Sequence, residues 1–144
     1  RPDSHPEIFE NAAVRFAANL DDHLLLIHGM QDQVVPFKTT VVLAEALIRE
    51  GKNFDVAFAP GATHSWSRET PYARFLFGKL LEHFDRYLDR AIRLGVERVF
   101  IIHGVGEGKL KNAIATRLLR HPDVVTFKNE YHPRYGFGAT EVVF

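Results

Sequence analysis

Cysteine is absent from the 144 residues of this chain. Its absence excludes disulfides, cysteine nucleophiles and thiolate metal sites. No apolar run approaches the roughly 18 residues that a membrane span needs, so we expect no membrane partner. The sequence also lacks the basic and then apolar leader of a signal peptide. It opens with Arg1 rather than Met, which favours a missing N-terminal portion.

The chain as a whole has no net charge, because 18 Lys and Arg balance 18 Asp and Glu. The balance of 46% hydrophobic and 25% charged residues is typical of a folded globular domain and excludes a disordered or coiled-coil chain. Residues 1–88 carry 9 basic and 12 acidic residues, whereas residues 89–144 carry 9 and 6. The net charge therefore changes from −3 to +3, which favours an anionic partner for the second part.

Short apolar runs alternate with helical periods along the chain. We predict strands at residues 24–29, 54–59 and 99–102, where apolar runs end at glycine or proline turns. We predict helices at residues 38–50, at 71–94 behind the cap Thr70, and after Gly108. Residues 124–127 and 140–144 are expected to close as a pair of strands. This alternation predicts an α/β fold with a mostly parallel sheet and a C-terminal strand pair.

Asp32 follows the first predicted strand in a His28-Gly29 turn, and His64 follows the second. Residues 3–88 with these motifs resemble the C-terminal end of the prolyl oligopeptidase and dipeptidyl peptidase family, which are α/β-hydrolase serine peptidases. The resemblance implies that Asp32 and His64 are the aspartate and histidine of a catalytic triad, with a peptide as substrate. Their order in the chain fits this fold, in which the aspartate precedes the histidine.

A buried carboxylate fixes the tautomer of its histidine partner and stabilises the imidazolium that forms on proton transfer. The nucleophile of this fold lies in a G-x-S-x-G turn, and no such pentapeptide occurs in the sequence. Ser4, Ser65 and Ser67 have no flanking glycines. We therefore expect little acyl transfer from this chain. The alternative is that Asp32 is a turn residue and His64 a loop residue.

A glycine-rich turn with a basic helix follows the strand at 99–102. Its residues are His103, Gly104, Gly106 and Gly108, with Lys109 and Lys111 opening the helix. Residues 88–144, including a second glycine motif at 136–140, resemble the C-terminal part of the small MutS-related (Smr) domain. The resemblance implies contact with DNA or RNA at this turn, and nicking in some members. The family's opening LDLHG-like motif has no clear counterpart, which favours binding over nicking.

The chemistry of this second motif suits a phosphate backbone. Glycines let the main chain turn and present its N–H groups, and a helix start adds a partial positive charge. Lys109 and Lys111 add full charges, and His103 can donate to a phosphate or transfer a proton. The turn is not a P-loop, because Leu110 stands where Ser or Thr is needed. The alternative is a plain turn with solvated lysines.

We therefore predict two joined parts: a partial α/β-hydrolase segment over 1–88 and a Smr-like segment over 89–144, with the junction inside the helix 71–94. We interpret the chain as a joined, truncated or recombined sequence. No cofactor is expected, and no metal site is predicted, because the 8 histidines form neither H-x-x-x-H nor H-E-x-x-H. The location of the protein stays open, and a cytoplasmic location is expected if the Smr-like part determines the function. Three hypotheses stay open: a hydrolase remnant, a nucleic-acid-binding or nicking module, and an inactive packed scaffold.

Overall fold

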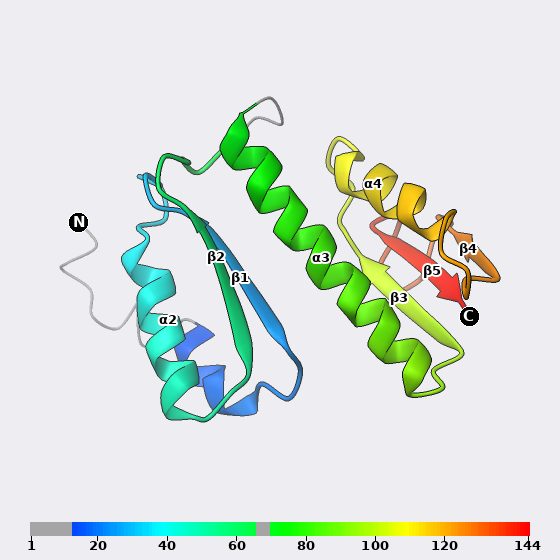
Figure 1. The fold of residues 1–144 in the computed structure, drawn as a ribbon, viewed down its shortest axis with the longest axis horizontal. Helices are drawn as coiled ribbons and strands as arrows, with labels where there is room; N and C mark the ends of the chain where they lie inside the picture. Colours follow the sequence, from blue (N-terminus) through cyan, green and yellow to red (C-terminus); the bar gives the residue numbers. More distant parts are fainter. Residues whose placement is uncertain (1–12, 66–69) are drawn as a thin grey trace. The chain divides into compact units, whose positions relative to one another are not determined.

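The computed structural model describes residues 13–65 and 70–144. Their elements are the 3-10 helix η2 (Ala13–Asn19), β1 (Leu24–Gly29), α2 (Lys38–Arg49), β2 (Phe54–Ala59), α3 (Pro71–Arg93), β3 (Arg98–Ile102), α4 (Lys109–Leu118), β4 (Thr126–Lys128) and β5 (Ala139–Val143) (Figure 1). The chain divides into two compact units, Arg1–His83 and Phe84–Phe144. No helix among the described residues is long and apolar enough to span a membrane.

In the first unit, β1 and β2 form a parallel pair joined through α2. The register runs from Leu24 opposite Phe54 to Gly29 opposite Ala59, and both arrowheads point the same way (Figure 1). Parallel strands need a long crossover, and a helix usually supplies it. The predicted strands, helix and parallel pairing are confirmed in this unit.

The second unit has an antiparallel sheet in the order β3-β5-β4. The prediction of a mostly parallel sheet is therefore wrong for this half of the chain. Because β3 and β4 are both antiparallel to β5, they run parallel to each other, as a strand–helix–strand unit through α4 requires. The last strand then enters between them instead of joining the edge. The predicted C-terminal strand pair is confirmed, with Thr126 opposite Val143 and Lys128 opposite Glu141.

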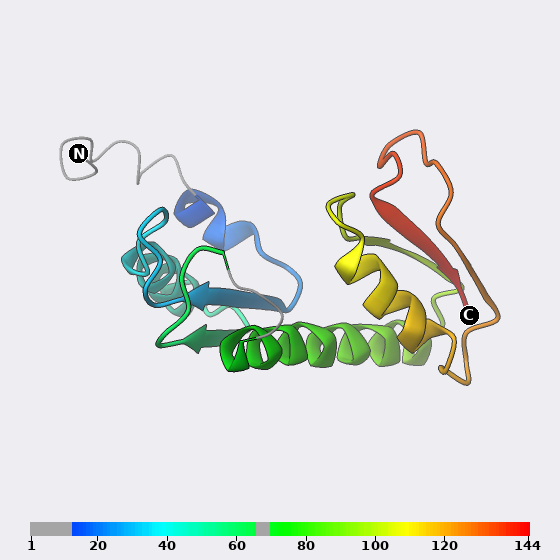
Figure 2. The same ribbon diagram turned by 90° about the horizontal axis from the view of Figure 1, so that it is seen from above.

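The long helix α3 begins and ends where local chemistry predicts. The Ala73 N–H donates to the Thr70 hydroxyl oxygen at 3.1 Å, and Pro71 takes the first helical position, where its missing N–H costs nothing. At the other end Gly95 has a φ of 70°. The Val96 N–H donates to the Ala91 carbonyl at 3.0 Å, closing the helix end. The 23 residues of α3 form one unbroken helix (Figure 2).

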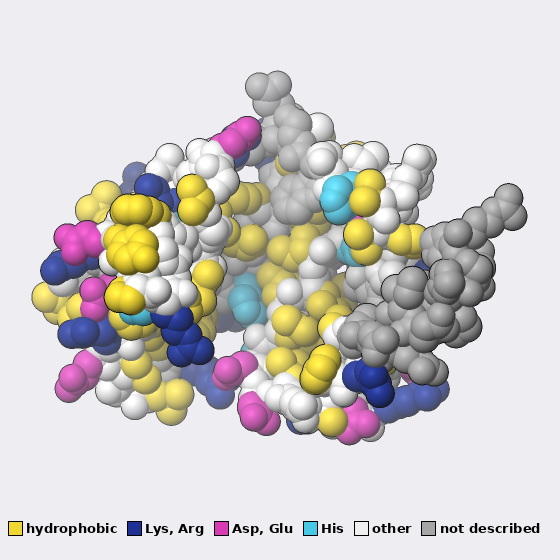
Figure 3. Space-filling view, turned by 180° about the vertical axis from the view of Figure 1, so that it is seen from behind, with side chains coloured by type: hydrophobic (Ala, Val, Ile, Leu, Met, Phe, Trp, Pro, Cys, Tyr) yellow, Lys and Arg dark blue, Asp and Glu magenta, His cyan; other side chains and the backbone are white. Residues whose placement is uncertain are grey.

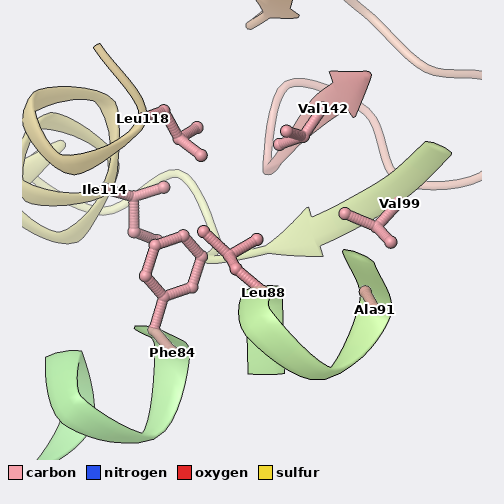
Figure 4. Close-up of a cluster of buried hydrophobic side chains, with 7 residues drawn as sticks. All are labelled: Phe84, Leu88, Ala91, Val99, Ile114, Leu118 and Val142. Carbon is pink, nitrogen blue, oxygen red and sulfur yellow. The ribbon is translucent and has the colours of Figure 1, made fainter. Parts of the chain in front are cut away.

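Each unit has its own apolar core, and α3 contributes to both. In the first unit Leu76 packs with alanines of β2 and the loop after it, and Leu25 and Ile27 of β1 adjoin them. In the second unit, α3 and α4 side chains converge on Val99 and Val142 of the sheet (Figure 4). That core comprises Phe84, Leu88, Ala91, Val99, Ile114, Leu118 and Val142.

The strand β2 has one buried and one exposed face. Ala57 and Ala59 are buried, whereas the alternating Val56 and Phe58 are 40% and 46% exposed. Other hydrophobic side chains among the described residues are also exposed, and hydrophobic side chains at the surface are visible in the space-filling view (Figure 3). Alternation along the strand therefore places one set of side chains in the core and the next at the surface.

Candidate functional site

The Asp32 carboxylate lies in the turn that follows β1 and is held by its own backbone. Its Oδ1 accepts hydrogen bonds from the N–H groups of Val34 at 2.9 Å and Val35 at 2.8 Å. Aspartate favours such turns because its short side chain reaches the backbone two or three residues on. The side chain is only 6% exposed, so these donors replace water around the carboxylate.

The loops after β1 and β2 are in direct contact, because parallel strands end at the same edge of a sheet. The Met30 N–H donates to the Ala59 carbonyl at 3.0 Å, and the Gln31 N–H donates to the Ala62 carbonyl at 2.9 Å. A Cβ atom added at Gly29 would lie only 2.4 Å from the Ala62 carbonyl oxygen. Glycine at this position therefore lets the two loops approach closely.

This close approach brings Asp32 and His64 together. The His64 Nδ1 atom lies 2.9 Å from Asp32 Oδ2. Because an ionised carboxylate can only accept, the ring donates from Nδ1, and a neutral His64 has its lone pair on Nε2. The His64 side chain is 50% exposed. The ring therefore has one nitrogen fixed on the carboxylate, in the tautomer that a general base requires.

His28 is a third member of this cluster, and this role was not predicted from the sequence. Its Nε2 lies 3.3 Å from the same Asp32 oxygen and 2.9 Å from the Val35 carbonyl. Its Nδ1 is hydrogen-bonded to the Thr40 hydroxyl. The side chain is 10% exposed. The signal for His28 in the sequence was its position four residues before Asp32, at the end of an apolar run.

These contacts set the charge of Asp32. Burial acts to raise its pKa, but the N–H groups of Val35 and Val34 and the adjacent His64 imidazole outweigh burial. Together they lower the pKa of the Asp32 carboxyl from 3.8 to about 2. Asp32 is therefore ionised at neutral pH and stays an acceptor for His64.

The sequence has no G-x-S-x-G turn that would place a serine nucleophile beside this pair. Ser65 follows His64 directly and lacks the glycines of a G-x-S-x-G turn. Its carbonyl accepts a hydrogen bond from the Thr63 hydroxyl at 3.0 Å. Ser4 and Ser67 lie outside the described residues. The geometry thus provides an aspartate–histidine pair, and the triad roles stay a prediction.

In the second unit, the turn between β3 and α4 has a backbone that favours glycine. Gly104, Gly106 and Gly108 have φ angles of 75°, 39° and 73°, a region that side chains with a Cβ rarely adopt. Gly108 is the N-cap of α4 and provides no side chain to cap the helix. The helix start is therefore not covered by a capping side chain.

The two glycine motifs of the sequence form one structure. The N–H groups of His103 and Gly104 both donate to the Gly138 carbonyl, at 2.9 and 3.0 Å. A Cβ atom added at Gly138 would lie 3.3 Å from Gly104 Cα. The segment before β5 therefore holds the turn after β3, and the absence of a side chain at Gly138 permits this contact.

His103 is hydrogen-bonded through both ring nitrogens. Its Nδ1 lies 2.7 Å from the Gly104 carbonyl oxygen and its Nε2 lies 2.9 Å from the Thr140 hydroxyl. The Thr140 hydroxyl donates to Asn129 Oδ1 and is buried with the rest of its side chain. Since a carbonyl can only accept, both bonds are satisfied together when His103 carries a proton on each nitrogen. The contacts of Thr140 and Asn129 around His103 were not predicted from the sequence.

The two predicted phosphate-binding lysines differ in their surroundings. Lys109 is 55% exposed and forms an ion pair with Glu107, which is 74% exposed. Lys111 is half-buried. The acidic neighbour reduces the positive charge at the turn, an effect that a count of lysines does not include. An exposed pair of this kind contributes little stability and separates readily.

Comparison with known proteins matches both parts of the chain. The model of the prolyl oligopeptidase family matches residues 1–91, and the model of the Smr domain matches residues 78–144. An endonuclease MutS2 of Staphylococcus saprophyticus is 41% identical over 58 residues, covering 40% of this chain and 7% of that protein. An endonuclease MutS2 of Thermomicrobium roseum is 42% identical over 62 residues, covering 43% of this chain and 8% of that protein.

Two solved structures are also similar in part. The Smr domain of Thermus thermophilus MutS2 is 33% identical with a TM-score of 0.42, covering 46% of this chain and 82% of that chain. A thermophilic esterase of Thermogutta terrifontis is 27% identical with a TM-score of 0.37, covering 50% of this chain and 25% of that chain.

The chain is thus an α/β protein in which a segment that matches the prolyl oligopeptidase family is followed by a segment that matches the Smr domain. The chain belongs to the prolyl oligopeptidase family, and its residues 78–144 match the Smr domain. The two matched ranges overlap within α3, and the precise junction at residue 88 stays a prediction. The chain spans less than a tenth of the length of the MutS2 relatives described above.

Proposed function

We propose that the second unit binds nucleic acid through the turn between β3 and α4. One observation supports this most directly: the segment that matches the Smr domain presents an uncapped helix start behind three positive-φ glycines. The relatives of this segment that are named endonuclease MutS2 support the same class of partner. The proposed contact residues are His103, Gly104, Gly106, Gly108, Lys109 and Lys111.

The proposed contact is with the phosphate backbone. The first N–H groups of α4 and its partial positive charge favour an anion. The doubly protonated form of His103 would add a positive charge close to the turn, and Lys109 can exchange Glu107 for a phosphate oxygen. None of these groups reads a base, so binding is expected to be independent of sequence and to weaken with salt.

The test is a titration of fluorescently labelled DNA and RNA with the full chain, followed by anisotropy at several salt concentrations. Lys109→Ala with Lys111→Ala is compared with a control, Lys38→Ala with Lys52→Ala, which removes the same charge from the first unit. For duplex DNA the slope of log K against log salt is negative, and each lost phosphate contact reduces its magnitude by about 0.9. We expect a shallower slope only for the first double variant.

Glu107→Gln provides a change in the opposite direction. It removes the acidic partner of Lys109 and is expected to tighten binding at low salt. Identical binding by both double lysine variants would overturn the proposed site. Incubation of the same proteins with supercoiled plasmid tests nicking separately, because nicking produces relaxed circles.

A second candidate function concerns Asp32 and His64. We propose that His64 is the general base of a serine-hydrolase site that acts on peptides, and that Asp32 supports it. We also propose that this chain by itself does not complete the reaction. The observation in favour is the 2.9 Å contact between His64 Nδ1 and Asp32 Oδ2. In such a site His64 Nε2 takes the proton of a serine hydroxyl, and Asp32 stabilises the imidazolium. His28 would hold the carboxylate in place.

Labelling with a fluorophosphonate tests this second proposal, because the reagent modifies only a serine that a base activates. We expect no His64-dependent labelling of the chain alone. Labelling that disappears in His64→Ala would show that a serine of this chain completes the site, and it would overturn the proposal of an incomplete site.

A further inference from the structure

Three metal-ligating side chains meet at the end of the first unit opposite to Asp32. His23 immediately precedes β1, Asp55 is the second residue of β2, and His83 belongs to α3. Asp32 follows the carboxyl end of β1, whereas His23 and Asp55 lie at the amino ends of the two strands. This cluster is therefore separate from the candidate hydrolase site.

The alternation of the strands explains why these side chains meet. Asp55 has the same parity along β2 as the buried Ala57, which places its side chain on the core-facing side of the strand. His23 directly precedes β1 and contacts the Asp55 carboxylate at 2.9 Å. His83 lies seven residues, or about two helical turns, after the buried Leu76. The two side chains are therefore on the same face of α3. Two imidazoles and a carboxylate therefore continue the apolar core at its end.

The atoms are close enough for one ion. His23 Nε2 lies 2.9 Å from Asp55 Oδ2, and the rings of His23 and His83 stack with centroids 5.7 Å apart. One ligating atom from each of the three residues lies within 4.8 Å of the others. In a tetrahedral zinc site, ligand atoms at about 2.1 Å from the metal are roughly 3.4 Å apart. The separations in the structure exceed that spacing by roughly 1.4 Å at most.

We propose that His23, Asp55 and His83 form a binding site for a divalent transition-metal ion, with Zn²⁺ as the expected ion. Two neutral imidazoles and one carboxylate are the donors that Zn²⁺ takes in three-ligand sites, where water fills the fourth position. Hard cations such as Mg²⁺ prefer oxygen ligands and are disfavoured by the two nitrogens. The His23 and Asp55 side chains are 29% and 40% exposed, so an ion and its water can enter.

The site was not visible in the sequence because its three residues come from three elements separated by 32 and 28 positions. Metal binding would link the amino ends of β1 and β2 to the interior of α3. An ion that binds only the folded state stabilises that state. The proposal is independent of nucleic-acid binding and of the Asp32–His64 pair, so it can fail or hold without either.

The test is isothermal titration of the chelator-treated full chain with Zn²⁺ alone, near neutral pH. His83→Gln and Asp55→Asn each remove one ligand. The matched control is His64→Gln, which removes an imidazole from the other His–Asp–His cluster of the same unit. We expect one site per chain. The Kd should rise in both ligand variants. Loss of an outer-shell partner already lowers metal affinity by roughly 10- to 100-fold, and loss of a direct ligand should cost at least as much. The Kd should be unchanged in the control.

A thermal melt with and without Zn²⁺ provides a second readout that does not depend on the heat of binding. The ion should raise the Tm of the wild-type chain and of His64→Gln, but not that of Asp55→Asn, which has the shape of the native side chain and tests loss of the ligand charge without a cavity. Absence of a saturable site in the wild type would overturn the proposal. So would a loss of binding in His64→Gln that equals or exceeds the loss in His83→Gln.

Discussion

The Asp32 cluster and the β3–α4 turn both follow the carboxyl end of a strand, but they are built from different parts of the chain. Around Asp32 the functional groups are side chains, because His28 and His64 both contact the same Asp32 carboxylate oxygen. At the β3–α4 turn many of the functional groups belong to the backbone, through glycines with positive φ and a helix start. A side-chain site loses its function when one member is missing, whereas a backbone site depends mainly on the fold that shapes it.

The largest losses of stability should come from substitutions in the two cores. Because α3 contributes to both cores, substitutions in this one helix can test each core separately. Leu76 and Leu88 are both buried in α3, in different cores. Truncation of a buried leucine to alanine costs about 2–5 kcal/mol. We expect Leu76→Ala to lower hydrogen-exchange protection mainly in β1 and β2, and Leu88→Ala mainly in β3 and β5. Equal losses in both sheets from either variant would contradict two separate cores.

The next effect concerns the contact between the loops of the Asp32 cluster. Gly29→Ala places a methyl group against the Ala62 carbonyl, at a distance that no real Cβ tolerates. Overpacking of this kind costs about 1–3 kcal/mol. We expect lower stability on urea unfolding, together with altered NMR shifts of the His64 ring as its loop moves. An unchanged His64 spectrum would show that Gly29 does not position the pair.

Two glycine-to-alanine substitutions compare how the backbone conformation of the β3–α4 turn and that of α3 affect stability. Gly104 has a φ of 75°, and Gly78 lies inside α3; an added Cβ has nothing within 4 Å at either position. Gly104→Ala should therefore cost about 1–2 kcal/mol through backbone conformation alone. Gly78→Ala should stabilise the chain by about 0.5–1 kcal/mol through helix propensity. Urea unfolding measures both, and a loss of stability in both variants would contradict the assigned conformations.

A smaller effect is expected from the titration of Asp32. Its pKa is lowered to about 2 in the folded chain, whereas an unfolded aspartate has a pKa of about 3.9. The folded state thus binds fewer protons, and the stabilisation from the ionised carboxylate is fully present above about pH 4 and is lost as pH falls through 2. The stability difference between wild type and Asp32→Asn should be constant above this window and shrink within it. A difference that grows toward low pH would contradict the lowered pKa.

Much of the fold could be predicted from local patterns. Thr70-Pro71 identified the start of α3, and the apolar runs before His28 and His103 identified β1 and β3. The insertion of β5 between β3 and β4 could not be predicted, because strand order depends on tertiary pairing and leaves no periodicity in the sequence. The same limit applies to the two sheets, since the unbroken helical period across α3 gives no sign that its two ends belong to different cores.

The candidate sites show the same division. The roles of Asp32 with His64, and of the glycines with Lys109, were predicted from motifs that resemble those of two known families. The roles of His28, Thr140 and Asn129 depend on contacts between distant segments, and so does the cluster of His23, Asp55 and His83. Neighbouring charge was also missed, because the ion pair of Lys109 with Glu107 reduces a charge that the sequence suggested was fully available.

The most direct test of the account is the salt dependence of DNA binding by the chain with Lys109→Ala and Lys111→Ala. If the β3–α4 turn is the contact, the magnitude of the negative slope of log K against log salt should decrease by up to about 2 relative to the wild type, while Lys38→Ala with Lys52→Ala leaves it unchanged. A wild-type slope in the Lys109→Ala and Lys111→Ala variant, or an equal decrease in the magnitude of the slope in both double variants, would contradict the account.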